Sequence, residues 1–548
     1  MADVESMSVI KDFGRFQKRQ FLLFCLAIFV HPWFSIGNTF YSASVEHYCR
    51  VTDNQTFSDS SHMKKCTIPY RYVNGDLKWD SCRMYANNLT NQNESIHFDT
   101  YSQTCRPSNV TRLCDRGWIY DRRDLHSTVV TEFDLVCGKD FMKQLSKSVS
   151  ASGELIGSLI FGQVADVYGR KPTVLVAGIL CLIFGICTAF APSFVTFIIG
   201  TFLSAFSASA ICLVIFVLAT EATPTSRRPL ISSGCSLSYS VGYLFLGITA
   251  YIVHGNWRLL QFISGAVCLL FIPYFWILEE SIRWHLQAGE NRKARIIINR
   301  ASNMNGDTMN EELFDVGSMC SVVEQQSERK SMFTLFKTPV IRKRILITSF
   351  CWFAIGLMYF GISLNVNFFA KNPYVIFVFT AAVEIPAALL NCWLLQRYQR
   401  RIIQCMTLIS SAVVLMIGGI SGTDWLLFIS VILVKLFVTL GLNTATLYTA
   451  ELFPTPVRNA ASGLTHVFMF LGDIIAPFIM LLDSVWYLAP LTVFSVPCII
   501  SGLLILLLPD TMNGPAPDSI EELENPYIIL ESNKNEQDRT QLVVKNYE

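Results

Sequence analysis

ATEATPTSRR, which runs from Ala219 to Arg228, and YTAELFPTPVR, which runs from Tyr448 to Arg458, are two copies of one pattern and decide the fold. A shift of 230 residues superimposes the acid, the proline and the final arginine of the two stretches. The same shift relates a second set of basic loop positions, Arg170 and Lys171 with Arg400 and Arg401. One constant shift that relates two separate loops is hard to obtain by chance, so the chain contains a duplicated unit.

Long apolar runs surround both copies. The chain of 548 residues is 52% hydrophobic and only 16% charged, whereas soluble domains have about 25% charged residues. A helix needs about 20 apolar residues to cross the hydrocarbon core of a bilayer. Twelve runs are close to this length or longer, at residues 20–41, 147–166, 172–190, 195–219, 231–252, 257–278, 343–363, 373–395, 402–421, 425–449, 462–482 and 486–508. We therefore predict an all-α polytopic membrane protein with twelve transmembrane helices in two pseudo-symmetric halves of six.

Basic residues predict the orientation of these spans, because short cytoplasmic loops are enriched in Lys and Arg. The loops that contain Arg170, Arg228, Arg400 and Arg458 are basic, and the alternate short loops are nearly free of such residues. Both termini are therefore expected in the cytoplasm. The predicted organisation is a cytoplasmic N-terminus at 1–19, span 1 at 20–41, an extracellular loop at 42–146, spans 2 to 6 at 147–278, a cytoplasmic loop at 279–342, spans 7 to 12 at 343–508 and a cytoplasmic tail at 509–548.

The loop at 42–146 has the composition of an extracellular domain. It contains six cysteines, which are disulfide candidates: Cys49, Cys66, Cys82, Cys105, Cys114 and Cys137. It also contains four Asn-x-Ser/Thr acceptors for glycosylation, at Asn54, Asn88, Asn93 and Asn109. Disulfides and glycans both belong to the oxidising side of a membrane, so this loop independently supports the orientation. The pairing of the cysteines stays open, because six cysteines permit many connectivities.

Charged residues at the cytoplasmic ends of the spans are candidates for a gate. A carboxylate that follows span 4 or span 10 can pair with an arginine after span 2 or span 8 and hold that side shut. The gating candidates are Asp166, Arg170, Glu221, Arg228, Arg400, Glu451 and Arg458. The alternative is that these are ordinary cytoplasmic loop charges with no latch.

Several motifs carry a resemblance to a known family. GQVADVYGRK (162–171) resembles the loop signature of the major facilitator superfamily, although Val167 replaces its usual arginine. The stretch at 118–137, WIYDRRDLHSTVVTEFDLVC, and AELFPTPVRN at 450–459 resemble the organic cation, anion and zwitterion transporters of solute carrier family 22. QRYQRR at 396–401 lacks the Asp and Gly of the C-half signature. The resemblance covers nearly the whole chain and favours a divergent branch near the carnitine and zwitterion carriers.

Ionisable groups inside the spans are the candidates for substrate binding, because each costs roughly 2.5–3.5 kcal/mol on insertion scales. Glu384, Lys435 and Asp473 lie near the middle of spans 8, 10 and 11, and Glu154 is a further acid in span 2. The resemblance implies that Glu384 and Lys435 correspond to charged positions of the family. The corresponding acid of span 11 is replaced by Phe470, with Asp473 three residues later on nearly the same helix face.

These charges favour a cationic or zwitterionic solute. Two acids against Lys435 leave a cavity with one net negative charge, although Glu384 and Lys435 are also compatible with a purely structural pair. Trp352 and Tyr359 are seven residues apart on one helix face, where ring faces attract quaternary ammonium groups. Lipid-facing rings are the alternative for both. The second half is thus expected to select the charge of the solute.

Enzymatic functions find no support. The sequence has no phosphate-binding loop, no spaced metal ligands and no nucleophile with a base, so we predict neither an enzyme nor an ATP-driven pump, and no metal or cofactor. A net charge of +1 gives no reason to expect nucleic acid. We predict a secondary-active or facilitative transporter of the plasma membrane, a monomeric unit in the lipid bilayer that carries carnitine-, ergothioneine- or betaine-like solutes by alternating access. Na+ and H+ are both candidates for a coupling ion. Alternatives are an organic anion transporter and a receptor or scaffold that does not transport.

Overall fold

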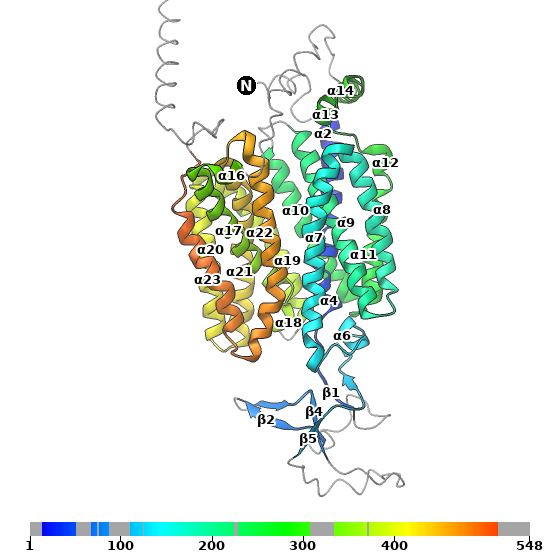
Figure 1. Cartoon of the computed structure of the whole chain (residues 1–548), viewed down its shortest axis with the longest axis vertical. Coiled ribbons are helices and arrows are strands. Elements are labelled where there is room, and N and C mark those ends of the chain that lie inside the picture. The colour runs from blue at the N-terminus through cyan, green and yellow to red at the C-terminus, as the bar shows by residue number, and fades with distance from the viewer. Residues whose placement is uncertain are drawn as a thin grey trace, which may run out of the picture.

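The computed structural model describes residues 14–50, 67–73, 76–86, 110–123, 125–223, 228–306, 334–369 and 372–512. Long helices run nearly parallel to one axis, with short strands at one end and the helices α13 (Ile282–Gln287) and α14 (Asn291–Asn305) at the other (Figure 1). We call these ends the strand end and the α14 end. Every predicted span corresponds to a helical segment, so the predicted fold class is confirmed.

The first half contains six helical segments. They are α2 (Arg15–Val30) with α3 (Pro32–Ser35) and α4 (Asn38–Tyr41), α7 (Asp140–Tyr168), α8 (Arg170–Ala189), α9 (Phe194–Glu221), α10 (Arg228–Ile252), and α11 (Trp257–Val267) with η4 (Cys268–Phe271) and α12 (Tyr274–Ile277). The break after α2 coincides with Pro32, whose missing N–H cannot continue the hydrogen-bond ladder.

The second half repeats the arrangement. Its segments are α17 (Pro339–Ser363), α19 (Pro373–Arg397), α20 (Arg400–Ile420), α21 (Asp424–Leu452), α22 (Thr455–Ile479) with η6 (Met480–Ser484), and α23 (Ala489–Ile505). Short helices α16 (Thr334–Lys337) and α18 (Val366–Phe369) flank α17. The halves meet along two helix pairs, α7 with α22 and α10 with α19.

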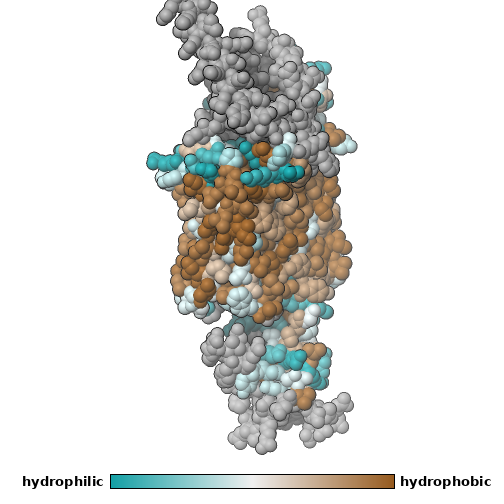
Figure 2. Space-filling view, turned by 60° about the vertical axis from the view of Figure 1, so that its left-hand side comes forward, coloured by the Kyte–Doolittle hydropathy of each residue, from teal (hydrophilic) through white to brown (hydrophobic). Residues whose placement is uncertain are grey.

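The outer surface of the bundle is suited to lipid. Within the described residues, ten segments are long and apolar enough to cross a membrane, and α23 is a shorter apolar helix. The remaining segment, α7, is 29 residues long but interrupts its apolar residues with serines and charged groups. On the face that Figure 2 shows, a broad hydrophobic band is bordered by hydrophilic residues at both ends. These features describe a multi-pass membrane protein.

A pair of close helix contacts reveals the duplication in three dimensions. A Cβ added to Gly242 on α10 would lie 2.1 Å from the Phe29 carbonyl oxygen of α2. A Cβ added to Gly472 on α22 would lie 2.6 Å from the Phe353 carbonyl oxygen of α17. The two glycines are again 230 residues apart. Each half therefore packs its first and fifth segments through the same small-residue contact, which brings the helix backbones together.

Short antiparallel strands and two disulfides form the described part of the predicted extracellular loop. β1 (His47–Cys49) pairs with β6 (Trp118–Tyr120), β2 (Tyr70–Val73) with β3 (Asp76–Trp79), and β4 (Arg83–Tyr85) with β5 (Thr111–Leu113). The disulfides join Cys49 to Cys114 and Cys82 to Cys137. Six predicted positions lie outside the described residues: Cys66, Cys105, Asn54, Asn88, Asn93 and Asn109.

Between the strands and the bundle lie α6 (Val129–Glu132) and η2 (Cys137–Lys139).

At the α14 end, α14 buries Ile297, Ile298 and Ala301 against Phe16 of α2. This contact ties the linker between the halves to the start of the chain.

Candidate functional site

A buried ion pair lies at the centre of the bundle. The Lys435 ammonium of α21 is 2.9 Å from Glu384 Oε1 of α19, and the two side chains are 0% and 2% exposed. The same carboxylate oxygen accepts a hydrogen bond of 2.7 Å from the Tyr359 hydroxyl of α17. Three helices of the second half thus direct polar groups to one point, where low dielectric strengthens their attraction.

The first half also contributes to this centre. Ser240 Oγ of α10 donates to Glu384 Oε2 over 3.1 Å. The Lys435 Nζ lies 5.2 Å from the centre of the Tyr243 ring, also of α10, and 3.2 Å from that of the Tyr359 ring. These ring contacts are of the kind that hold cations. The centre therefore bridges the two halves.

Sequence reasoning missed three members of the centre: Ser240, Tyr243 and Ser363. The Ser363 hydroxyl lies 2.6 Å from Lys435 Nζ and completes the environment of the ammonium group. Ser240 and Tyr243 belong to the run SLSYSVGY of α10. Spacings of three and four residues place side chains on one helix face, and this polar face within an apolar span is the signal that could have identified them.

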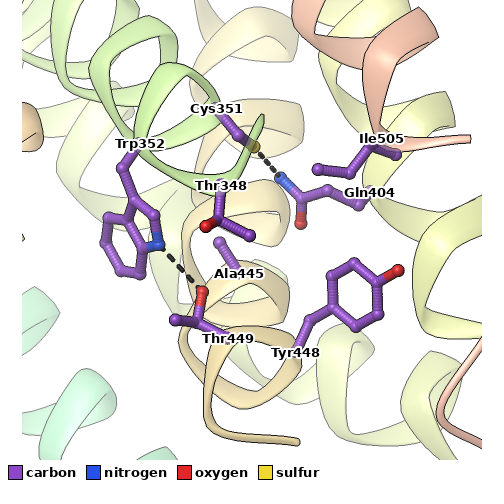
Figure 3. Close-up of a pocket in the computed structure, with 8 residues that line it drawn as sticks. All are labelled: Thr348, Cys351, Trp352, Gln404, Ala445, Tyr448, Thr449 and Ile505. Carbon is purple, nitrogen blue, oxygen red and sulfur yellow. Dashed lines mark hydrogen bonds between the residues drawn. The ribbon is translucent and has the colours of Figure 1, made fainter. Parts of the chain in front are cut away.

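Trp352 and Tyr359 do not share a site, although both are buried. The Trp352 indole N–H donates to Thr449 Oγ1 over 3.0 Å, and its ring lies 4.5 Å from that of His466. Figure 3 shows Trp352 directed toward Thr449 at a small pocket between α17, α20 and α21, with the Gln404 amide directed toward Cys351. Trp352 is thus held by neighbours of its own rather than by the ion pair.

Asp473 also lies apart from the ion pair. It is 2% exposed on α22, and its charge environment is shaped by Glu154 of α7. In the part of the chain that the structure describes, neither a hydrogen bond nor an ion pair joins Asp473 to Glu384 or Lys435. Of the three charges that sequence reasoning placed in one cavity, Glu384 and Lys435 form a neutral pair, and Asp473 lies instead within electrostatic reach of Glu154.

The predicted gating residues form two related clusters at the α14 end. Arg170 Nη2 is 3.1 Å from Asp166 Oδ1 and 3.0 Å from Glu221 Oε1. Arg400 Nε is 3.4 Å from Glu451 Oε2 in the second half. Arg170 begins α8 and Glu221 ends α9, while Arg400 begins α20 and Glu451 lies in the last turn of α21. Each cluster therefore joins two consecutive helices of one half.

A carbonyl contact repeats with the same 230-residue shift. Arg170 Nη1 donates to the Ala165 carbonyl over 3.2 Å, and Arg400 Nη1 donates to the Leu395 carbonyl over 3.0 Å. The counterpart of Asp166 is Gln396. Arg170 therefore contacts two carboxylates, and Arg400 forms an ion pair with one among the described residues.

Of the other gating candidates, Arg458 Nε donates to the Phe453 carbonyl over 3.2 Å, and the side chain of Arg228 lies outside the described residues. Sequence reasoning missed Glu280, whose carboxylate accepts from the backbone N–H groups of Arg170 and Lys171 at 3.0 and 3.1 Å. It thus caps the start of α8, where unpaired N–H groups favour an anion.

The halves are connected at the strand end by hydrogen bonds. Lys147 Nζ of α7 donates to the Leu364 carbonyl over 2.6 Å and to Asn365 Oδ1 over 3.0 Å. Thr39 Oγ1 of α4 donates to the Ser363 carbonyl over 3.0 Å. These hydrogen bonds join the two halves at the strand end.

The 118–137 motif attaches the strands to the bundle. The Glu132 carboxylate accepts from Arg258 Nε over 3.1 Å and from the Trp257 indole over 2.8 Å. Partial burial raises the pKa of Glu132, but the hydrogen bonds from Arg258 and Trp257 outweigh burial, so this pKa lies below its usual value. Tyr120 donates to Asp134 Oδ1 over 2.8 Å in the same motif.

Known families match most of the chain. The family described as Sugar (and other) transporter matches residues 87–369, and the Major Facilitator Superfamily matches residues 373–537. An organic cation transporter protein of Drosophila melanogaster is 32% identical over 532 residues, covering 94% of this chain and 93% of the relative. Human solute carrier family 22 member 13 is 31% identical and covers 95% and 93%. Organic anion transporter 3 of Oryctolagus cuniculus is 30% identical and covers 78% and 79%.

Solved structures share the fold. The partially occluded, inward-open xylose transporter XylE from E. coli aligns with a TM-score of 0.57 at 13% identity, over 69% of this chain and 89% of that one. The proton:xylose symporter XylE bound to a bromodeoxyglucose aligns with a TM-score of 0.55 at 16% identity, over 71% and 89%. At these identities the likeness concerns the fold alone.

Proposed function

Because the chain belongs to solute carrier family 22, within the major facilitator superfamily, we propose that it carries small organic cations and zwitterions across the plasma membrane by alternating access. The observation that carries this proposal is the buried pair of Glu384 and Lys435, which polar groups of both halves surround. A transporter of this class has no need of enzymatic chemistry, because opening and closing of the halves moves the solute.

An ammonium solute can take the place of Lys435 beside Glu384. The carboxylate is already held by the hydroxyls of Tyr359 and Ser240, so little reorganisation is needed when one cation replaces another. The rings of Tyr359 and Tyr243 offer faces to a quaternary ammonium group. The displaced Lys435 then attracts the carboxylate of a zwitterion, which favours carnitine-, ergothioneine- or betaine-like solutes.

The clusters at the two ends suit alternating access. We assign the strand end to the outside and the α14 end to the cytoplasm, in agreement with the disulfides and with the basic loops. Lys147 then closes the outer path in this state. The Arg170 and Arg400 clusters belong to the cytoplasmic gate and hold the hairpins of each half rigid as the halves move.

Organic anions are the second candidate substrate class. Lys435 is fully buried and carries a positive charge to the centre of the bundle. An anion could take the place of Glu384 beside Lys435, and one relative is named for organic anions. Na+ and H+ both stay candidates for the coupling ion.

Uptake into cells decides between these classes. We would express the chain and measure uptake of a labelled quaternary ammonium cation, a betaine and an aromatic carboxylate, with and without sodium. Glu290→Gln, at a half-buried carboxylate outside the spans that pairs with Lys293 and His285, is the control. We expect uptake of the cation and the betaine, and its loss in Glu384→Gln. Uptake of the carboxylate alone would overturn the proposal in favour of an anion carrier, and no uptake of any solute would favour the receptor or scaffold.

A further inference from the structure

A second pair of charged side chains lies between the halves and has no part in the ion pair described above. Glu154 on α7 and Asp473 on α22 are each 2% exposed. Glu154 Oε2 and Asp473 Oδ1 find no hydrogen-bond partner among the described residues. Buried carboxylate oxygens without partners are costly, so the two groups require an explanation beyond packing.

Glu154 and Asp473 lie on the neighbouring helices α7 and α22, within electrostatic reach of each other. Ser148 Oγ donates to the Ile474 carbonyl over 2.7 Å and fixes the two helices at that level. Glu154 follows about 9 Å further along α7, while Asp473 is adjacent to Ile474. Because α7 and α22 are antiparallel neighbours (Figure 1) and helical side chains lean toward the N-terminus, each carboxyl leans along its helix toward the level of the other.

Other titratable groups face the pair from the surrounding helices. His31, at the break between α2 and α3, has its Nε2 3.9 Å from Glu154 Oε2, and its Nδ1 lacks a partner among the described residues. Cys212 of α9 and Tyr239 of α10 lie within electrostatic reach of Glu154. No lysine or arginine forms an ion pair with either carboxyl in the described part of the chain. Among the described residues, His31 is thus the one basic group that forms an ion pair with either carboxylate.

We propose that Glu154 and Asp473 form a proton-binding site that couples solute movement to proton movement. Two carboxylates in a low-dielectric space repel each other strongly, so the closed pair holds a proton that a separated, hydrated pair releases. As the halves close at the strand end and the carboxylates come together, one of them takes up a proton from water on that side. Closure traps the proton with the solute, and separation at the α14 end releases it as H+ to that side.

The proposal rests on the proposed transport function but concerns different residues from the ion pair. Its test uses a quaternary ammonium cation, whose own charge does not change with pH. We expect uptake by the wild-type chain to rise several-fold as the external pH falls from about 8 to about 6. Addition of the cation to proteoliposomes should also carry protons inward, which a trapped pH dye detects. Pyranine is a suitable dye for this measurement.

Variants assign the proton to the pair. Glu154→Gln and Asp473→Asn should lose the pH dependence, whereas Glu154→Asp, His31→Gln and the control Glu290→Gln should keep it. Proton flux in the wild-type chain tests the proposal even if the neutral variants fail to reach the membrane. Cation uptake that is independent of pH, or pH dependence that only His31→Gln removes, would overturn the proton site. Absence of cation uptake would instead contradict the proposed function.

Discussion

The Lys435 ammonium lies 2.9 Å from Glu384 Oε1 in a place that water does not reach. Each group neutralises the other where an isolated charge would be very costly. Tyr359, Ser240 and Ser363 supply hydrogen bonds to the two ions. This arrangement makes the pair difficult to dissect with single substitutions, because removing one charge leaves the other buried and unpaired.

Glu384→Gln should reduce both folding and transport. An uncompensated Lys435 costs about 3–5 kcal/mol, so we expect less protein at the cell surface and no cation uptake. The double variant Glu384→Gln with Lys435→Met removes the unpaired charge and should recover surface expression, measured by biotinylation, without recovering uptake. If the double variant transported cations at the wild-type rate, the pair would be only structural.

Glu451→Gln should slow transport more than Glu221→Gln does. Loss of Glu221 leaves Arg170 with Asp166, whereas loss of Glu451 removes the one carboxylate described beside Arg400. The measurement is the initial uptake rate divided by the amount of protein at the surface. Equal rates for both variants and the wild type would mean that these residues are loop charges without a role in gating.

Gly472→Ala should destabilise the fold. The added methyl group would meet the Phe353 carbonyl at 2.6 Å, and such overpacking costs about 1–3 kcal/mol. Gly463→Ala is a matched control on the same helix, because a Cβ there meets no atom within 4 Å. Alanine at an open helical position is favourable by roughly 0.5–1 kcal/mol. Thermal unfolding of the purified protein should separate the two, and similar melting temperatures would contradict the close contact.

Glu132→Gln should lower stability at neutral pH and have less effect in acid. The pKa of Glu132 is below its usual value in the folded protein, so its ionised form stabilises the fold above the unfolded pKa of about 4.3. That contribution disappears as the pH falls through the folded pKa. The difference in melting temperature between wild type and variant should therefore shrink below about pH 4. A difference that grew in acid would mean that folding raises, rather than lowers, the pKa of Glu132.

Much of the architecture was predictable because its signals are local or repetitive. Apolar runs of membrane length are visible residue by residue, so all twelve helical segments were found, although α7 and α22 begin at Asp140 and Thr455, seven residues before their predicted starts. The 230-residue shift connects Arg170 with Arg400 and Glu221 with Glu451 without any knowledge of packing. Glu384 and Lys435 were identifiable because charge inside a span is rare and costly.

Which buried groups meet each other was decided only by tertiary structure. Asp473 and Glu384 are both mid-span acids of the second half, yet Asp473 lies toward Glu154 and Glu384 toward Lys435. Trp352 and Tyr359 share a helix face, yet the first contacts Thr449 and the second contacts Glu384. A sequence determines that a helix crosses the membrane, but the rotation and depth at which it meets distant helices follow from the packing of the whole bundle.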